Sequence, residues 1–149
     1  MKYNFIIDCG HGGIDKKGNY VSCPNYEEDN PNTFYKMYVH EDGLKIYEGD
    51  FNRKVRDFLF EIYVEQGGDF LLTNAHVLYG EDYEDTPLDD RVIHLNNYVK
   101  ESKYLNIGIS IHGNAGGGTG NEVFTYRNST VSKGYAEYWA KNIQKNMPN

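Results

Sequence analysis

The sequence is short of the residues that mark disulfide-rich, membrane-spanning or nucleic-acid-binding proteins. Its 149 residues include only two cysteines, Cys9 and Cys23, which form no Cys-x-x-Cys pair and no disulfide framework. No apolar run approaches the roughly 20 residues that a transmembrane helix needs, and no signal peptide precedes the strand-like run at Tyr3. Basic residues number 15 against 22 acidic ones, so the chain offers no basic face to nucleic acid.

What the sequence does contain is an alternation of short apolar runs with amphipathic segments. Residues 15–32 show no periodicity and are expected to form a long loop, and Asp42-Gly43 between two strand-like runs predicts a hairpin from 35–40 and 44–47. Apolar runs predict strands, and apolar residues at helical spacing predict helices. The expected strands are residues 3–8, 69–73, 107–111 and 122–126, and the expected helices are 48–64, a helix opening at Thr86, and 132–146.

Each of the first two helices carries an apolar stripe that is expected to face the core. The stripe of helix 48–64 consists of Phe51, Val55, Phe58, Leu59 and Ile62. The stripe of the following helix consists of Leu88, Val92, Leu95 and Val99. Thr86 is the expected N-cap of that helix, with Pro87 in its first turn.

This alternation predicts one α/β domain over residues 1–149. Strands that alternate with helices favour a largely parallel, mixed central sheet with helices on both faces. In open sheets of this kind, ligands bind at the carboxyl ends of the strands. Candidate functional residues are therefore sought directly after the predicted strands.

Two histidines follow predicted strands in glycine-rich surroundings. His11 comes after the first strand in the run Cys-Gly-His-Gly-Gly, and His112 ends the strand 107–111 in the run Ile-His-Gly-Asn. The glycines allow tight turns and the close approach of another group. The two rings are therefore expected at the same edge of the sheet.

Glu48 is the third candidate, on geometric grounds. It lies three positions before Phe51, on the apolar stripe of its helix. A carboxylate on a core-facing side is costly unless it meets a cation or several donors. Two histidines and one carboxylate suit zinc with an open fourth position, where a water of lowered pKa would bind.

Spacing alone leaves other interpretations open. A histidine at a strand end is commonly structural, and Glu48 could simply favour the positive end of its own helix dipole. Cys9 could be a ligand or a nucleophile with His11 or His112 as base, although a small buried thiol is the commoner role. The remaining histidines lack the glycine context and are interpreted as structural; they are His40, His76 and His94.

Taken together, the motifs resemble the zinc-dependent N-acetylmuramoyl-L-alanine amidases of the amidase-3 type. Residues 6–15 are similar to the family's Asp-Pro-Gly-His-Gly-Gly opening, with Cys9 in place of proline. Glu48, with Asn52 four residues later, resembles the second ligand, and residues 110–115 resemble the third-ligand motif. A Leu-x-x-Arg-x-x-x-x-Asn pattern is matched by Leu88, Arg91 and Asn96. The motifs follow the family order over nearly the whole chain.

The resemblance implies a phosphorylase/hydrolase-like fold, Zn²⁺ held by His11, Glu48 and His112, and a substrate-binding role for Asn114. The implied reaction is hydrolysis of the amide between N-acetylmuramic acid and L-alanine, with peptidoglycan or a muropeptide as partner. We expect a monomer or weak dimer that is made in the cytoplasm and acts on the cell wall after release.

Two departures from the family pattern qualify these expectations. Residues 16–47 are longer than the family usually has before its glutamate. They form either a wall over the substrate groove, with Tyr20, Tyr26, Phe34 and Tyr35 as contacts, or an ornamental loop and hairpin.

The second departure concerns catalysis. The family's last strand ends in a Val-Glu-Leu-Gly-Phe-like motif whose glutamate is the implied acid/base. The sequence to Asn149 contains no such motif, so we expect the sheet to lack this strand and to have an exposed edge. Glu122 is a weak substitute for that base. The alternative function is a catalytically incomplete zinc- or peptidoglycan-binding module or a remnant.

Overall fold

The computed structural model describes residues 3–21, 36–65, 70–72, 83–113 and 122–146. The chain divides into two compact units, residues 1–115 and 116–149. The described part of the first unit holds the sheet, a hairpin and two helices. The described part of the second unit holds helix α5 (Thr130–Asn146), which begins two residues earlier than predicted.

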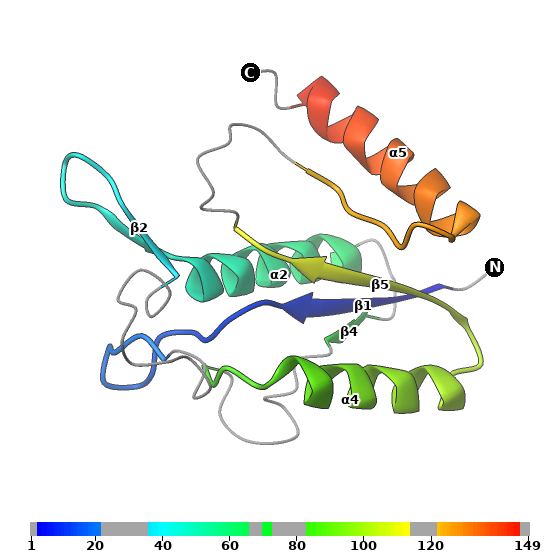
Figure 1. Cartoon of the computed structure of the whole chain (residues 1–149), viewed down its shortest axis with the longest axis horizontal. Helices are drawn as coiled ribbons and strands as arrows, with labels where there is room; N and C mark the ends of the chain where they lie inside the picture. The colour runs from blue at the N-terminus through cyan, green and yellow to red at the C-terminus, as the bar shows by residue number, and fades with distance from the viewer. Residues whose placement is uncertain (1–2, 22–35, 66–69, 73–82, 114–121, 147–149) are drawn as a thin grey trace. The chain divides into compact units, whose positions relative to one another are not determined.

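The sheet of the first unit has three parallel strands in the order β4-β1-β5 (Figure 1). They are β1 (Tyr3–Cys9), β4 (Phe70–Leu72) and β5 (Leu105–Ile111). Strands β1 and β5 are paired along their whole lengths, from Tyr3 opposite Leu105 to Cys9 opposite Ile111. The prediction of a parallel sheet in a mixed α/β fold is confirmed, and both of these strands end at the same edge.

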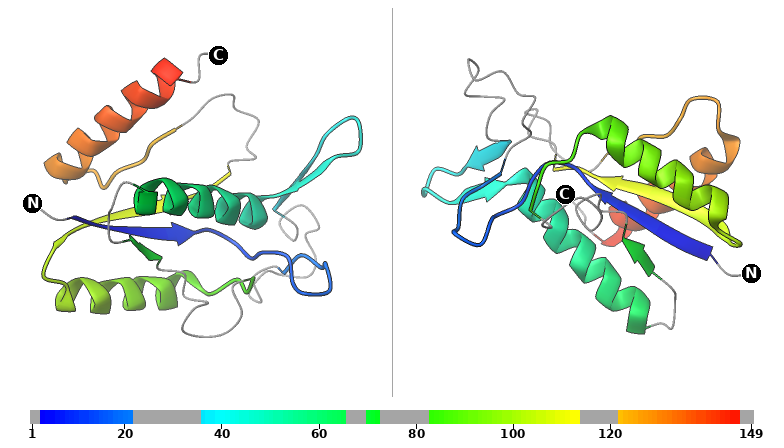
Figure 2. Two further views of the ribbon diagram at one scale, coloured as in Figure 1. Left: turned by 180° about the vertical axis from the view of Figure 1, so that it is seen from behind. Right: turned by 90° about the horizontal axis from the view of Figure 1, so that it is seen from below.

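Helices α2 (Glu48–Glu65) and α4 (Leu88–Glu101) cover opposite faces of β1 (Figure 2). Side chains alternate between the two faces of a strand. The ring of Phe5 packs edge-on against Tyr63 of α2, whereas the Asn4 amide donates to the Tyr98 hydroxyl of α4. The chain passes from β1 to β4 and then back across β1 to β5, so right-handed crossovers require the two connecting helices to lie on opposite faces.

Helix α2 buries a different face from the one predicted. Phe51, Phe58 and Ile62 of the expected stripe are 46%, 62% and 37% exposed. The buried positions near its start are polar or small instead: Glu48, Gly49, Asn52, Arg53 and Arg56. The prediction from apolar spacing was wrong here because the side chains of Asn52 and Arg53 make hydrogen bonds with carbonyls of the loop that follows β1.

Two further predictions on local structure were wrong. The N-cap of α4 is Pro87 and makes no side-chain cap hydrogen bond, whereas Thr86 is buried and its carbonyl accepts a hydrogen bond from Arg91. Residues 122–126 do not form a strand, and their side chains are exposed. Alternating apolar residues favour a strand only where a neighbouring strand supplies hydrogen bonds, and no pairing is found for this segment within the described part of the chain.

The predicted hairpin is confirmed and leads directly into α2. Its strands are β2 (Met37–Val39) and β3 (Lys45–Tyr47), with Tyr38 opposite Ile46. Gly43 in the turn has φ +88°, a conformation that glycine adopts without strain. Because β3 ends at Tyr47 and α2 begins at Glu48, no loop separates the hairpin from the helix. None of the described helices combines the length and apolarity needed to cross a bilayer.

Arg91 of α4 links the helix to the sheet through Asp8 of β1. Its Nη1 lies 2.6 Å from both carboxylate oxygens of Asp8, and the Ser110 hydroxyl donates to the same carboxylate at 2.7 Å. The Arg91 and Asp8 side chains are only 13% and 21% exposed. Hydrogen bonds between charged, largely buried groups are among the stronger ones in proteins.

Replacing Arg91 with methionine is expected to lower the free energy of unfolding by about 2 kcal/mol, because the Asp8 carboxylate loses its charged donor. Urea unfolding of the purified chain measures the change. The control is Lys54→Met, which removes an exposed ion pair with Asp50 and should cost less than about 0.5 kcal/mol. Equal stability of the Arg91 variant and the unaltered chain would contradict a structural role for this pair.

Candidate metal centre

The two histidines predicted to meet at the sheet edge do so. The ladder between β1 and β5 continues one step beyond the strands, where the Gly10 amide donates to the Ile111 carbonyl at 3.1 Å. His11 and His112 follow directly on the two sides of this bond. Their ring centroids are 5.3 Å apart and the ring planes are nearly perpendicular, at 82°.

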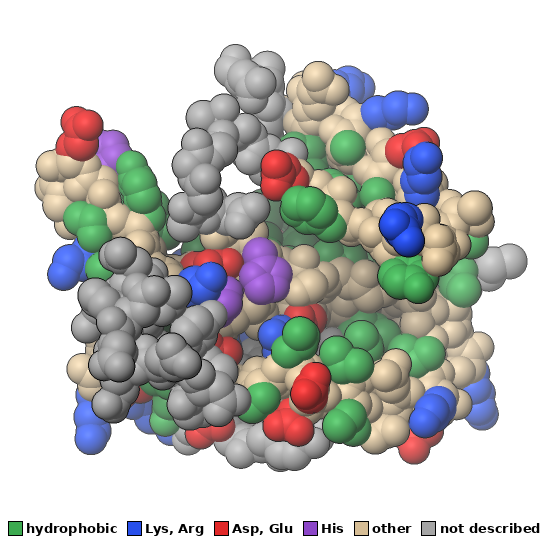
Figure 3. Space-filling view, viewed as in Figure 1, with side chains coloured by type: hydrophobic (Ala, Val, Ile, Leu, Met, Phe, Trp, Pro, Cys, Tyr) green, Lys and Arg blue, Asp and Glu red, His purple; other side chains and the backbone are tan. Residues whose placement is uncertain are grey.

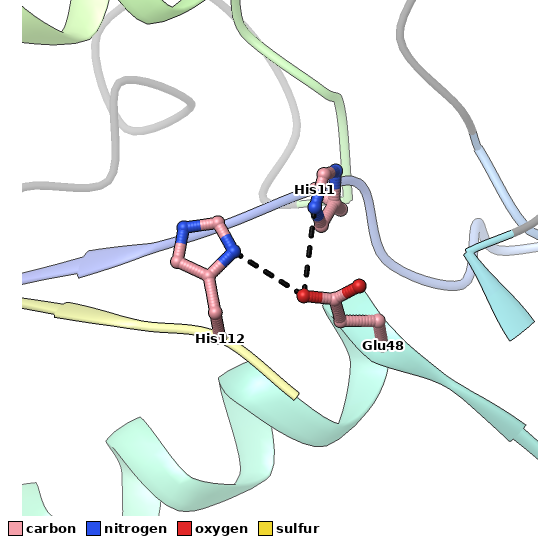
Figure 4. Close-up of side chains that lie close together, drawn as sticks. All are labelled: His11, Glu48 and His112. Atoms are coloured by element: carbon pink, nitrogen blue, oxygen red, sulfur yellow. Dashed lines mark hydrogen bonds and ion pairs between the residues drawn. The ribbon is translucent and has the colours of Figure 1, made fainter. Parts of the chain in front are cut away.

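Glu48 lies opposite both rings, at the first position of α2 (Figure 4). Its Oε1 is 3.2 Å from Nδ1 of His112 and 3.5 Å from Nε2 of His11. The Glu48 side chain is only 8% exposed. Its backbone amide donates to the Lys36 carbonyl at 2.7 Å, which fixes the start of the helix against the base of the hairpin.

These three side chains could hold a metal ion. One donor atom from each residue can be chosen so that all lie within 4.8 Å of one another. His112 presents Nδ1 to the cluster and His11 presents Nε2, as Figure 4 shows. The His112 side chain is 46% exposed, so solvent reaches the cluster. In the space-filling view, histidine side chains lie beside acidic ones near the middle of the visible face (Figure 3).

Buried polar side chains of α2 hold the loop that carries His11. The Asn52 side-chain amide donates to the Gly10 carbonyl at 2.8 Å, and Arg53 Nη1 donates to the His11 carbonyl at 2.6 Å. His11 has φ +64°, a left-handed conformation that is uncommon for residues other than glycine. Hydrogen bonds on both sides of this strained residue therefore stabilise the backbone that presents its ring.

Asp85 is a member of this region that the sequence did not single out. Its Oδ2 lies 3.8 Å from Nδ1 of His11, and its side chain is 7% exposed. It precedes Thr86-Pro87 in a segment with no periodicity and no glycine context, so no sequence signal marked it. Only the fold brings this carboxylate beside the histidine.

Tyr20, from the predicted insertion, packs close to these acidic groups. Its ring stacks on Tyr47 with centroids 4.7 Å apart. Burial raises the pKa of the Tyr20 hydroxyl, and the charges of Asp85 and Glu48 add to the rise. The nearby Gly49 amide opposes the rise, yet no partner of good hydrogen-bond geometry is present among the described residues. Stacking and burial favour a packing role for Tyr20 over the predicted substrate contact.

The other candidate residues lie apart from the cluster or outside the described residues. Cys9 is 2% exposed, and its thiol donates to the Asn52 carbonyl at 3.6 Å, so burial favours the packing role over that of a ligand or nucleophile. His40 pairs with Asp42 in the exposed hairpin turn, and His94 lines a cavity of about 290 Å³ between α4 and the sheet. Asn114 and His76 lie outside the described residues, as do Tyr26, Phe34 and Tyr35. Glu122 belongs to the second unit, and its role as a base stays a prediction.

Comparison of the chain with protein-family models, with curated proteins and with solved structures gives no match.

The His112 ring packs directly against the backbone of Gly10, so residue 10 must lack a side chain. A Cβ atom built on Gly10 would overlap the His112 ring. We expect Gly10→Ala to displace that ring and to weaken metal binding roughly tenfold or more, because ligand geometry controls affinity. Competition with a chromogenic chelator measures the dissociation constant.

Gly108→Ala is the matched control, because a Cβ at this position in the neighbouring strand meets nothing within 4 Å. This variant should bind metal as the unaltered chain does. Equal losses of affinity in the two variants would show that the effect comes from the strands and not from contact with His112.

The raised pKa of Tyr20 predicts a loss of stability in alkaline solution. The folded state holds this proton more tightly than the unfolded state, so the contribution is fully present below the ordinary pKa of 10.0 and is lost as pH rises above it. Tyr20→Phe should therefore lose less stability than the unaltered chain between about pH 8 and about pH 11. Urea unfolding at the two pH values measures the difference, and parallel declines would contradict it.

Proposed function

We propose that the His11, Glu48 and His112 cluster binds zinc. Two imidazole nitrogens and one carboxylate oxygen are one of the donor sets found in catalytic zinc sites, which leave a further position open. Magnesium and calcium prefer sites made of oxygen donors. A buried carboxylate whose ion-pair contacts are two histidine rings also favours a bound cation, since a charge that is removed from water needs compensation.

We further propose that the chain is a zinc-dependent hydrolase of the N-acetylmuramoyl-L-alanine amidase type. The observation that carries this proposal is the meeting of His11, Glu48 and His112 at the carboxyl edge of a parallel sheet. These residues stand in the three motifs whose order in the sequence resembles that of the amidases. The substrate would be the amide between N-acetylmuramic acid and L-alanine in peptidoglycan or a muropeptide.

In the proposed reaction, the residues of the chain would bind the metal, position its ligands and bind the substrate. His11, Glu48 and His112 hold the ion, and the exposed side of the His112 ring leaves room for substrate to approach. Zinc, when bound, supplies a Lewis acid that polarises a carbonyl and lowers the pKa of water toward neutrality. Asn52 and Arg53 keep His11 in place through the carbonyls of the loop. Asn114, two residues after His112, is proposed to bind substrate.

A binding module without catalytic activity is the second candidate function. The position of Asp85 favours this second function. Among the described residues, Asp85 is the carboxylate other than Glu48 that lies beside the cluster. Asp85 lies at Nδ1 of His11, on the other side of the ring from the Glu48 carboxylate. A general base must reach the water it deprotonates, and from behind the ring Asp85 is poorly placed to do so.

Zinc binding and amide cleavage are tested separately. The purified chain is expected to bind one equivalent of zinc, and both His11→Ala and Glu48→Gln should lose it, because each removes a donor. His40→Ala is the control, since this exposed histidine pairs with Asp42 away from the cluster. Plasma emission spectrometry after dialysis measures the zinc content.

Digestion of muropeptides then distinguishes the two candidate functions. An active amidase releases new L-alanine amino termini in the presence of zinc, and His11→Ala releases none. A chain that binds zinc and sedimented peptidoglycan but releases no L-alanine termini is a binding module. A chain that retains no zinc after dialysis contradicts the metal centre itself.

A further inference from the structure

Asp85 is held beside His11 by hydrogen bonds that reach its neighbours from other parts of the fold. The Gly13 amide donates to the Tyr83 carbonyl at 2.6 Å, and Arg53 Nη2 donates to the Glu84 carbonyl at 3.2 Å. On the other side of Asp85, Arg91 Nε donates to the Thr86 carbonyl at 3.2 Å. The segment that carries the carboxylate is therefore fixed both to the loop after β1 and to α4.

Arg53 couples the two residues most directly. The same guanidinium donates to the carbonyl of His11 and to that of Glu84, the residue before Asp85. It also donates to the Gly49 carbonyl one turn earlier in α2. One buried side chain thus sets the distance between the histidine backbone and the segment that presents the carboxylate.

The His11 ring lies between two carboxylates that approach different nitrogens. Glu48 faces Nε2 at 3.5 Å, and Asp85 faces Nδ1 at 3.8 Å. A neutral imidazole carries a proton on one nitrogen and a lone pair on the other. When Nε2 binds a metal ion, the ring proton must lie on Nδ1, where the Asp85 carboxylate can accept it.

We propose that Asp85 is a positioning residue that fixes His11 in the Nδ1-protonated form and orients its ring for metal binding through Nε2. This proposal rests on the metal centre proposed above and not on amidase activity. A separation of 3.8 Å is within ion-pair range but longer than a hydrogen bond, so this role requires Asp85 to approach the ring when metal binds. Carboxylates in such positions commonly orient metal-binding histidines and raise their basicity.

The two histidines of the cluster differ in this respect. The His11 side chain is 15% exposed and has the Asp85 carboxylate behind it, whereas that of His112 is 46% exposed. In the part of the chain that the structure describes, no carboxylate forms an ion pair with the other ring nitrogen of His112, Nε2. His11 is therefore the preorganised ligand of the pair, and its orientation should depend on Asp85 more than on solvent.

The test compares zinc affinities of Asp85 variants by chelator competition. Asp85→Ala is expected to raise the zinc dissociation constant roughly 10- to 100-fold, because it removes the proton acceptor of His11. Asp85→Asn keeps the volume but lacks the charge, so it should also bind more weakly. Asp42→Ala is the matched control: it removes the carboxylate beside His40, in the exposed hairpin turn, and should leave zinc affinity unchanged.

A second measurement reports the tautomer directly. Long-range proton–nitrogen correlation spectra of the zinc-loaded chain should show His11 protonated at Nδ1, and in Asp85→Asn this proton should exchange faster with solvent. Thermal unfolding of the metal-free variants checks that they fold. If Asp85→Ala does not fold, the Asn variant supplies both measurements.

The outcomes separate this proposal from those above. Zinc affinity within twofold of the unaltered chain in both Asp85 variants overturns the role of Asp85 and leaves the metal centre standing. A zinc-loaded His11 that is protonated at Nε2 overturns both the role of Asp85 and zinc binding through Nε2. An unaltered chain that binds no zinc overturns both. Weakened binding in the Asp85 variants supports the proposal even if the chain cleaves no muropeptide.

Discussion

The hydrogen bonds between the buried polar face of α2 and the loop after β1 are the constraint on which the proposed metal centre depends. Asn52 and Arg53 bind the carbonyls of Gly10 and His11, and Glu48 lies one turn before them on the same helix. The helix that supplies the carboxylate of the proposed site therefore also fixes the histidine opposite it. A buried polar group without partners is costly, so these side chains restrict how the helix can sit against the loop.

Much of this arrangement could be predicted from the sequence. Strand ends rich in glycine identified His11 and His112, and the whole-length pairing of β1 with β5 places them at one edge. Glu48 was predicted to face the core because it lies on the apolar stripe of its helix, and only part of that prediction is correct. It is buried as expected, but its buried neighbours on the helix are polar side chains, whereas Phe51 of the predicted apolar stripe is largely exposed.

The errors share a physical cause. Apolar spacing reports which face of a helix would leave water most readily, and it does not register long-range hydrogen bonds such as the one from Arg53 to the Glu84 carbonyl. The same holds for Thr86, which had the residue type of a cap yet lies buried with its carbonyl bonded to Arg91. Asp85 could not be predicted from the sequence, because it approaches His11 only where the loop before α4 packs against the loop after β1.

The three proposed ligands come from separate segments, and Glu48 and His112 are 64 positions apart in the chain. No short stretch of the unfolded polypeptide can gather them, so a complete site exists only after β1, α2 and β5 have come together. Contacts between distant segments form slowly, because the chain must first lose the entropy of closing long loops. An ion that binds only the folded chain shifts the folding equilibrium by mass action. The ion would therefore bind late in folding, after the three segments have come together, and would stabilise a fold that has already formed.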